Sequence, residues 1–287
     1  MKPFSALAAV DLRREPVDGV LDHVERALGV RLDRGGVVSK RRSVGARTDR
    51  GTWVRVERRL VEKIDGQGQG WNGTEAAATL TGVAKPRWLA GVAWRDEAEP
   101  VMWRADETSV LPGAPVKPGG TLTVDPDLAP GWWDALNQSL DALSAQRTTR
   151  IATPDTVTVT QALVSEAITS TFGDVGDTTI ARWAPAHADV NWANVTAPEF
   201  CLFDWEDWGQ APRGLDSASL WGNSLALPAL AERVWHERRH DLDSRDGLLM
   251  ALFFCSKVVG RYADEADPRL KPARRAAERL LAALQTG

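Results

Sequence analysis

Residues 187–216 read HADVNWANVTAPEFCLFDWEDWGQAPRGLD, and this segment carries the most specific pattern in the chain. His187, Asp189 and Asn194 stand in an HxDxxxxN arrangement. The apolar residues 200–203 are predicted to form a strand, and Asp204 follows them directly. We expect residues 195–199, which include a proline, to form the turn of a hairpin. Such a hairpin would bring Asn194 and Asp204 together.

The residue types in this segment suit phosphoryl transfer. That reaction needs a carboxylate at the acceptor hydroxyl, oxygen ligands for Mg²⁺ and a clamp on the phosphates. Asp189, on a loop, would accept the hydroxyl proton and orient the hydroxyl for in-line attack. The amide oxygen of Asn194 and the carboxylate of Asp204 are ligands that Mg²⁺ prefers.

The segment resembles the catalytic loop and metal loop of the aminoglycoside phosphotransferase and choline kinase group. The family pattern is HGDxxxxN, then an aspartate in an I/F-D-W-E/D context, where this chain has HADVNWAN and FDWE. The resemblance implies that Asp189 is the catalytic aspartate and that Asn194 and Asp204 bind Mg²⁺. It also implies that His187 braces the loop and that Asp216, in a GLD sequence, hydrogen-bonds the loop backbone.

The resemblance extends more faintly to the first third of the chain. Arg55 stands where the family keeps a phosphate-binding lysine, and Glu75 where a helix glutamate pairs with that lysine. Arginine keeps the positive charge but presents a planar fork instead of a compact ammonium. Trp53, on the same strand face, would crowd an adenine. We expect Arg55 to bind the phosphates, with Arg58 as the alternative. The competing interpretation is that Arg55 lines an exposed strand face and that Glu75 is a solvent-facing residue of a helix.

Strand-like patterns dominate the first third of the chain and helical patterns the remainder, which is typical of α+β proteins. The predicted strands cover 37–44, 52–57, 88–94 and 100–104; the predicted helices lie around 20–28, from 72–74 onward, at 130–146, in the later part of 154–171 and beyond 225. Together with the resemblance, this order predicts a protein-kinase-like two-lobed fold. The small β-rich lobe, residues 1–109, would bind nucleotide, and the larger, mostly helical lobe, residues 110–287, would carry catalysis and substrate binding.

Aromatic and acidic residues surround the predicted metal aspartate. The chain has 13 Trp, and Trp205 and Trp208 flank Glu206 and Asp207. These two tryptophans and Trp192 are expected either in the core or as a wall for a flat or cationic substrate. The two carboxylates would pair with a substrate amine, or else belong to the loop scaffold and the solvated surface.

The composition excludes several other classes of protein. A formal net charge of −4 argues against a dedicated nucleic-acid binder. No apolar run approaches the roughly 20 residues that cross a bilayer, and the amino-terminal apolar segment is too short for a signal peptide, so we expect no membrane association and a cytoplasmic protein.

The sequence therefore predicts a phosphotransferase that uses ATP and Mg²⁺. Its acceptor would be a hydroxyl of a small, amine-bearing molecule such as an aminoglycoside-like antibiotic or a metabolite. The alternative is a catalytically silent kinase fold that binds a nucleotide or another ligand. The sequence does not predict the oligomeric state.

Overall fold

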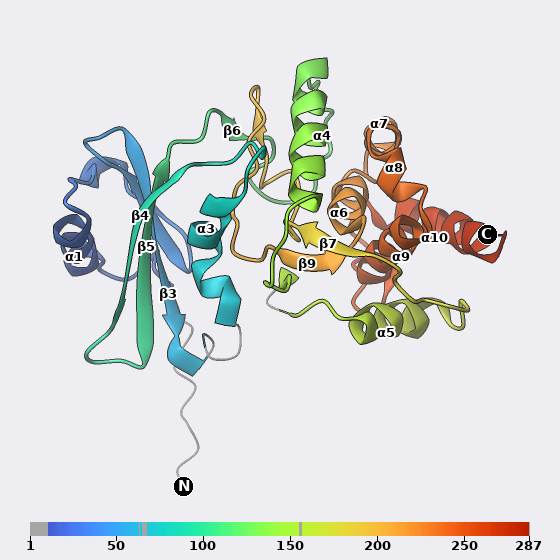
Figure 1. Cartoon of the computed structure of the whole chain (residues 1–287), viewed down its shortest axis with the longest axis horizontal. Helices are drawn as coiled ribbons and strands as arrows, with labels where there is room; N and C mark the ends of the chain where they lie inside the picture. The colour runs from blue at the N-terminus through green and yellow to red at the C-terminus, as the bar shows by residue number, and fades with distance from the viewer. Residues whose placement is uncertain (1–10, 63, 65–67, 155–156, 287) are drawn as a thin grey trace, which may run out of the picture. The chain divides into compact units, whose positions relative to one another are not determined.

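The computed structural model describes residues 11–62, 64, 68–154 and 157–286 (Figure 1). These residues form two compact units. Unit 1 comprises the chain up to residue 78 and residues 86–110, and unit 2 comprises residues 79–85 and 111 onward. Residues 1–10, on which the expectation about a signal peptide rests, lie outside the described residues.

Unit 1 is built on a five-stranded antiparallel sheet with the order β1-β2-β3-β5-β4. The strands are β1 (Val38–Ser39), β2 (Ser43–Arg47), β3 (Thr52–Leu60), β4 (Trp88–Arg95) and β5 (Val101–Ser109). The single strand predicted over 37–44 is divided, because a turn forms in which the Lys40 N–H donates to the Ser43 carbonyl at 2.8 Å. The other predicted strands of this unit are present and somewhat longer.

The two faces of this sheet differ in chemistry, since side chains alternate along each strand. Leu21 and Val24 of α1 (Asp18–Leu28) pack with Val54, Val56 and Trp103 in a buried core on one face. The opposite face carries charged residues of β3 and β5 and lies toward α3 (Gly73–Ala76), so the two helices cover different faces (Figure 1). Short 3-10 turns occupy Arg34–Gly36, Gly68–Asn72 and Ala77–Thr79.

Unit 2 is mostly helical. Its helices are α4 (Pro130–Ser144), α5 (Gln161–Phe172), α6 (Leu215–Asn223), α7 (Pro228–Glu237), α8 (Arg239–Leu242), α9 (Arg245–Val259) and α10 (Leu270–Thr286). Most of α9 is buried, and it packs against α5, α6, α8 and α10. Two small antiparallel pairs complete the unit, β6 (Ala114–Pro115) with β8 (Thr196–Ala197) and β7 (Trp183–Ala186) with β9 (Gly209–Pro212).

Glycines allow the start of α6 to approach α9. Gly214, with φ of +89°, caps α6, and a Cβ there would lie 3.0 Å from the Cα of Gly247. A Cβ on Gly247 would lie 2.0 Å from the carbonyl oxygen of Asp241, so no side chain fits. The close approach of Gly214 to Gly247 fixes the first turn of α6, which carries Asp216.

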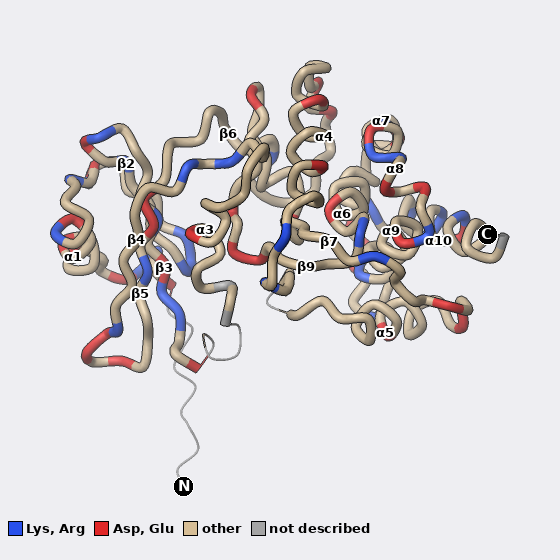
Figure 2. Tube along the Cα trace, viewed as in Figure 1, with Lys and Arg blue, Asp and Glu red and all other residues tan. Residues whose placement is uncertain are grey.

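Acidic and basic residues are interspersed over both units (Figure 2). Within the described residues, no helix is both long and apolar enough to span a bilayer. The predicted α+β organisation, with a β-rich first part and a helix-rich remainder, is confirmed.

Candidate active site

The site begins with a hairpin that follows β7 and includes β8. The Phe203 N–H donates to the Asn194 carbonyl at 3.0 Å, and Val195 bridges Leu202 in antiparallel fashion. The chain reverses direction as predicted, but the turn is shorter than 195–199, because Val195 lies in the bridge and Thr196–Ala197 form β8. Residues 200–203 make only this single bridge, however, so the regular strand predicted there is wrong. The hairpin still sets Asp204 one residue beyond the backbone partner of Asn194.

Two amides orient the carboxylate of Asp189. Asn194 Nδ2 donates to Asp189 Oδ2 at 2.7 Å and to the Asp189 carbonyl at 2.9 Å, while Asn191 Nδ2 donates to Asp189 Oδ1 at 2.8 Å. The amide nitrogen of Asn194 is thereby committed to Asp189. Its Oδ1 accepts no hydrogen bond from the part of the chain that the structure describes, so this oxygen can face a cation. Sequence reasoning missed Asn191, although its position two residues after Asp189 is the signal that could have indicated it.

His187 connects the loop to the segment that ends at Asp204. Its buried ring donates from Nε2 to the Phe203 carbonyl at 3.0 Å and accepts the Asp189 N–H at Nδ1, 3.3 Å away. The ring of Trp205 packs edge-on against it, with centroids 4.6 Å apart. Burial lowers the pKa of His187 to about 4, and the nearby Asp204 carboxylate only partly opposes this. His187 is therefore neutral near pH 7 and acts as a fixed support rather than a proton carrier.

Asp216, in the first turn of α6, holds the loop backbone. Its carboxylate accepts the N–H of His187 at 2.7 Å and that of Ala188 at 2.8 Å. Burial raises the pKa of Asp216 to about 6, while these two donors and Arg238 act in the opposite direction. Ala188 stands where the family pattern has glycine, and its φ of +72° is in the left-handed region that glycine favours. The two bonds from Asp216 support this backbone conformation.

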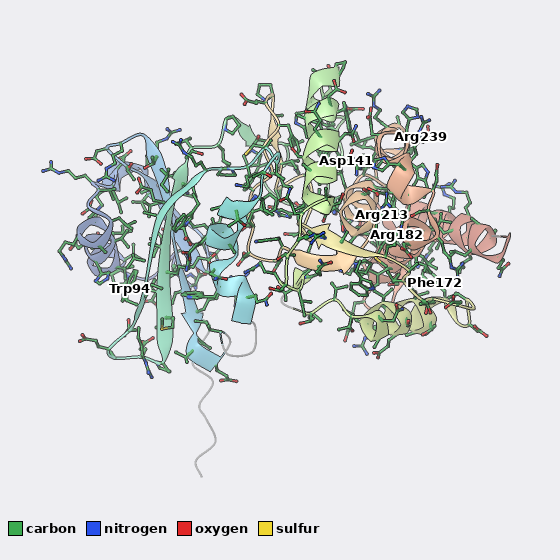
Figure 3. All side chains as sticks on the ribbon, viewed as in Figure 1. Trp94, Asp141, Phe172, Arg182, Arg213 and Arg239 are labelled. Carbon is green, nitrogen blue, oxygen red and sulfur yellow. The ribbon has the colours of Figure 1, made fainter. Side chains whose placement is uncertain are left out.

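A buried charge network lies behind Asp216. The Arg238 side chain, from a residue only 1% exposed, contacts Asp241 at 2.7 Å, Asp141 of α4 at 2.9 Å and the Ser217 hydroxyl at 3.2 Å. Asp241 also accepts from Ser217 at 2.9 Å and from Arg213 at 3.1 Å; Asp141 and Arg213 are labelled in Figure 3. Sequence reasoning missed this network, because its members come from segments far apart in the sequence and no local motif joins them.

Trp205 and Trp208 are core residues. They are 2% and 3% exposed. Trp205 Nε1 donates to the Leu202 carbonyl at 2.8 Å, and the guanidinium of Arg150 lies 5.0 Å from the centre of a Trp208 ring. The expectation that they form a substrate wall is wrong, because both side chains are buried.

The two acidic residues between these tryptophans differ in their surroundings. The Thr153 hydroxyl donates to Asp207 Oδ1 at 3.2 Å, and the Thr153 N–H donates to the Asp207 carbonyl at 3.0 Å. Asp207 is thus tied to the segment that precedes α5. Glu206 is partly exposed and stays a candidate for contact with a substrate amine.

In unit 1, Glu75 pairs with a different arginine from the one expected. Its carboxylate contacts Arg104 of β5 at 2.9 Å, and Arg104 also makes two bonds of 2.7 Å to Asp106. The expected pairing of Glu75 with Arg55 is wrong, because α3 packs on β4, and β5 lies between β4 and β3 in the sheet. Arg104 was not indicated by any motif.

The two candidate phosphate clamps lie on opposite faces of β3. Arg55 is partly exposed and forms an ion pair with Glu57. Arg58 forms an ion pair with Glu99, and its guanidinium lies 5.7 Å from the centre of the Trp103 ring, on the face that α1 covers. Arg55 is therefore the better candidate of the two.

Trp53 covers part of the face that carries Arg55. A Cβ added to Gly45 of β2 would lie 2.3 Å from the Trp53 ring, so the indole lies directly against the backbone of β2. This ring occupies space on the face where a nucleotide base was expected.

The donor atoms of the hairpin fit a hard cation. Within the described residues, no group of three or more His, Cys, Asp or Glu could hold a metal ion. A site here would combine the amide oxygen of Asn194 with the carboxylate of Asp204, and such oxygen donors suit Mg²⁺ rather than Zn²⁺.

No family model matches the chain, and no curated protein matches its sequence. Solved structures do match. An ADP-bound aminoglycoside phosphotransferase, APH(2″)-Ib, is 11% identical with a TM-score of 0.53, over 93% of this chain and 99% of that one. A choline/ethanolamine kinase family protein from Mesorhizobium loti is 14% identical with a TM-score of 0.50, over 93% and 99%. Amicoumacin kinase hAmiN, in complex with AMP-PNP, Ca²⁺ and Ami, is 12% identical with a TM-score of 0.50, over 91% and 92%.

These similarities extend over nearly the whole of each chain. The chain therefore has the α+β kinase-like fold seen in structures of aminoglycoside phosphotransferases and choline kinase family proteins, and the predicted fold is confirmed.

Proposed function

We propose that this chain is a phosphotransferase that uses ATP and Mg²⁺ and transfers the γ-phosphoryl group to a hydroxyl of a small, amine-bearing molecule. One observation carries the proposal. Asn194 bonds the Asp189 carboxylate through its amide nitrogen, while the hairpin sets Asp204 beside Asn194. Small-molecule kinases with the same fold, among them structures holding ADP or AMP-PNP with Ca²⁺, support it.

Each residue of the site has a chemical role in this proposal. Asp189 accepts the proton of the acceptor hydroxyl. As it does so, the hydroxyl oxygen bonds to the γ-phosphorus, and the bond between the γ-phosphorus and the oxygen that leaves with ADP breaks. Asn191 and Asn194 aim the carboxylate by their hydrogen bonds. Asn194 Oδ1 and Asp204 would hold Mg²⁺, which when bound neutralises charge on the phosphates.

The proposed acceptor class rests on charge. Glu206 lies two residues after Asp204 and is partly exposed, so its carboxylate can receive an ammonium group. The neighbours named for aminoglycosides and for choline or ethanolamine point to the same class.

The face of unit 1 favours a second candidate, a catalytically silent kinase fold that binds a nucleotide or another ligand. Arg55 is already paired with Glu57, and the Trp53 indole lies against Gly45. Both features reduce the space and charge available to a nucleotide on this face.

Measuring ATP consumption by the purified chain with Mg²⁺ and a panel of aminoglycosides and amino alcohols tests the proposal. Asp189→Asn should lower turnover by about 10²–10⁴-fold, since the amide cannot accept the proton. Its thermal unfolding temperature should fall only modestly, because the amide keeps the shape of the side chain and loses one of the two hydrogen bonds from Asn191 and Asn194. Glu166→Gln, an exposed change on α5, serves as the matched control.

The results separate the candidates. Full turnover by Asp189→Asn would contradict the role given to Asp189. Mg²⁺-dependent nucleotide binding with no turnover across the whole panel would instead support the silent kinase fold.

A further inference from the structure

A second concave region lies among the helices of unit 2, apart from the catalytic loop. Helices α6, α7, α9 and α10 enclose a groove of about 560 Å³, a volume within the range of small-molecule sites. Its lining is mainly apolar and includes Trp221, Leu225, Leu248 and Leu280. It shares no lining residue with the site around Asp189.

The walls of this groove are already ordered. The rings of Trp221 and Trp235 meet edge to face with centroids 5.4 Å apart, and Trp235 Nε1 donates to Asp243 at 2.8 Å. Trp221 is buried on α6, and Leu225 follows the same helix. A ligand would therefore find rigid aromatic and aliphatic surfaces without rearrangement of the walls.

The charges that line the groove are unevenly placed. Arg275 and Arg279, one turn apart on α10, both line it, and neither forms an ion pair within the described residues. Arg274, the residue directly before Arg275, does not line the groove and pairs with Glu265 at 3.3 Å. Glu232 of α7 is the acidic lining residue, so the lining carries a net positive charge.

We propose that this groove binds a small amphipathic anion. The aliphatic or aromatic body of the ligand packs against Trp221 and Leu225, and its acidic group bonds Arg275 and Arg279. Two guanidiniums on the α10 wall of an apolar groove match a carboxylate, sulfonate or phosphate, which arginine binds with paired donors. The ligand places its acidic group toward α10 and away from Glu232.

The groove is also joined to the catalytic loop. Ser224 lies between Trp221 and Leu225, which both line the groove, and its hydroxyl accepts the Nε1–H of Trp192 at 3.1 Å. Trp192 stands between Asp189 and Asn194 in the sequence. A molecule in the groove would thus contact Trp221 and Leu225, on either side of the serine that is hydrogen-bonded to Trp192 of the catalytic loop.

Fluorescence titration of the full chain with 8-anilinonaphthalene-1-sulfonate, an aromatic anion, tests the proposal. Decanoate should displace this probe at about tenfold lower concentration than decyltrimethylammonium, which has a similar chain and the opposite charge. The double variant Arg275→Gln/Arg279→Gln should weaken probe binding by about tenfold. Lys271→Gln/Arg274→Gln, a matched pair on the same helix outside the lining, should leave it unchanged, and Glu232→Gln should strengthen it.

A steric variant keeps the test independent of charge. Ala283→Trp, at an exposed lining position, should block the probe without loss of thermal stability. Displacement of the probe at equal concentrations of decanoate and decyltrimethylammonium would overturn the proposal. Equal loss of probe binding in Arg275→Gln/Arg279→Gln and in the control Lys271→Gln/Arg274→Gln would do the same. So would a dimer in sedimentation that Ala283→Trp dissociates, because a second copy would then fill the groove. No nucleotide is used, so failure of the phosphotransferase proposal would not affect the result.

Discussion

His187 links the geometry of the catalytic loop to pH. Its ring is enclosed, its Nε2 donates to Phe203 and its Nδ1 accepts from Asp189, so both nitrogens are used only when the ring is neutral. Protonation would turn Nδ1 into a donor facing another donor, the Asp189 N–H. The lowered pKa of about 4 and the two hydrogen bonds of the ring thus both favour neutral His187.

Replacing this residue should change how stability depends on pH. The pKa of His187 falls from 6.5 when unfolded to about 4 when folded, so the unfolded state binds more protons between these values. The contribution of the neutral ring is therefore full above pH 6.5 and is lost as the pH falls toward 4. His187→Gln keeps a donor for Phe203 and removes this loss, which is about 3 kcal/mol at most. Urea unfolding at pH 7.5, 5.5 and 4.5 measures it.

Asp216 changes stability with pH in the opposite direction to His187. The variant His187→Gln is therefore needed as a reference. Its pKa is raised to about 6, so its contribution is full below pH 3.8 and is lost as the pH rises toward 6. Wild-type stability alone would mix the two groups. Equal pH slopes for wild type and His187→Gln would contradict the assignment of a buried neutral histidine.

Residues close together in sequence were predictable, and residues joined only by the fold were not. Asp189 and Asn194 were found from their spacing, because a loop keeps residues five apart within hydrogen-bonding reach. Arg104 and Glu75 are 29 residues apart, and Arg238 and Asp141 are 97 apart. Their pairing depends on strand order and helix packing, which local patterns do not contain.

At the scale of elements, the contact between the start of α6 and α9 controls the position of Asp216. Gly247→Ala should destabilise the protein by more than about 2 kcal/mol, because the new Cβ would lie 2.0 Å from the Asp241 carbonyl and the backbone must move. Gly131→Ala, in the first turn of α4 with nothing within 4 Å, is the control and should be neutral or stabilising by up to about 1 kcal/mol. Urea unfolding compares the two. A loss of equal size in both variants would show that α9 is not close-packed against Asp241 of α8 at Gly247.

Periodic patterns predicted the longer elements well, and the shortest ones poorly. The helix predicted over 130–146 corresponds to α4, because its apolar spacing persists over several turns. The helix expected from residues 72–74 onward is only Gly73–Ala76 followed by a 3-10 turn, and no side chain caps it. In such short segments tertiary contacts override local preference, as they do for residues 200–203.

At the scale of the whole chain, the segment between α3 and β4 belongs to the helical unit. The Ala84 N–H donates to the Ser139 hydroxyl at 3.0 Å, and the Leu202 N–H donates to the Ala84 carbonyl at 2.8 Å. Residues 79–85 therefore pack beside the catalytic hairpin, although the sequence places them among the strands of unit 1. No local pattern indicates which unit a connecting segment joins.

Ligand linkage tests the metal site in the full chain. A ligand that binds only the folded state raises the free energy of unfolding, by about 2.7 kcal/mol at one hundred times its Kd. Thermal unfolding with AMP-PNP should show this stabilisation when Mg²⁺ is present and much less of it with EDTA, because Asn194 and Asp204 supply the proposed ligands. Asp204→Asn should lose the Mg²⁺-dependent part, and Glu166→Gln should keep it. Stabilisation of equal size with and without Mg²⁺ would mean that the hairpin does not bind the metal, and the phosphotransferase proposal would then lose its support in the geometry of the loop.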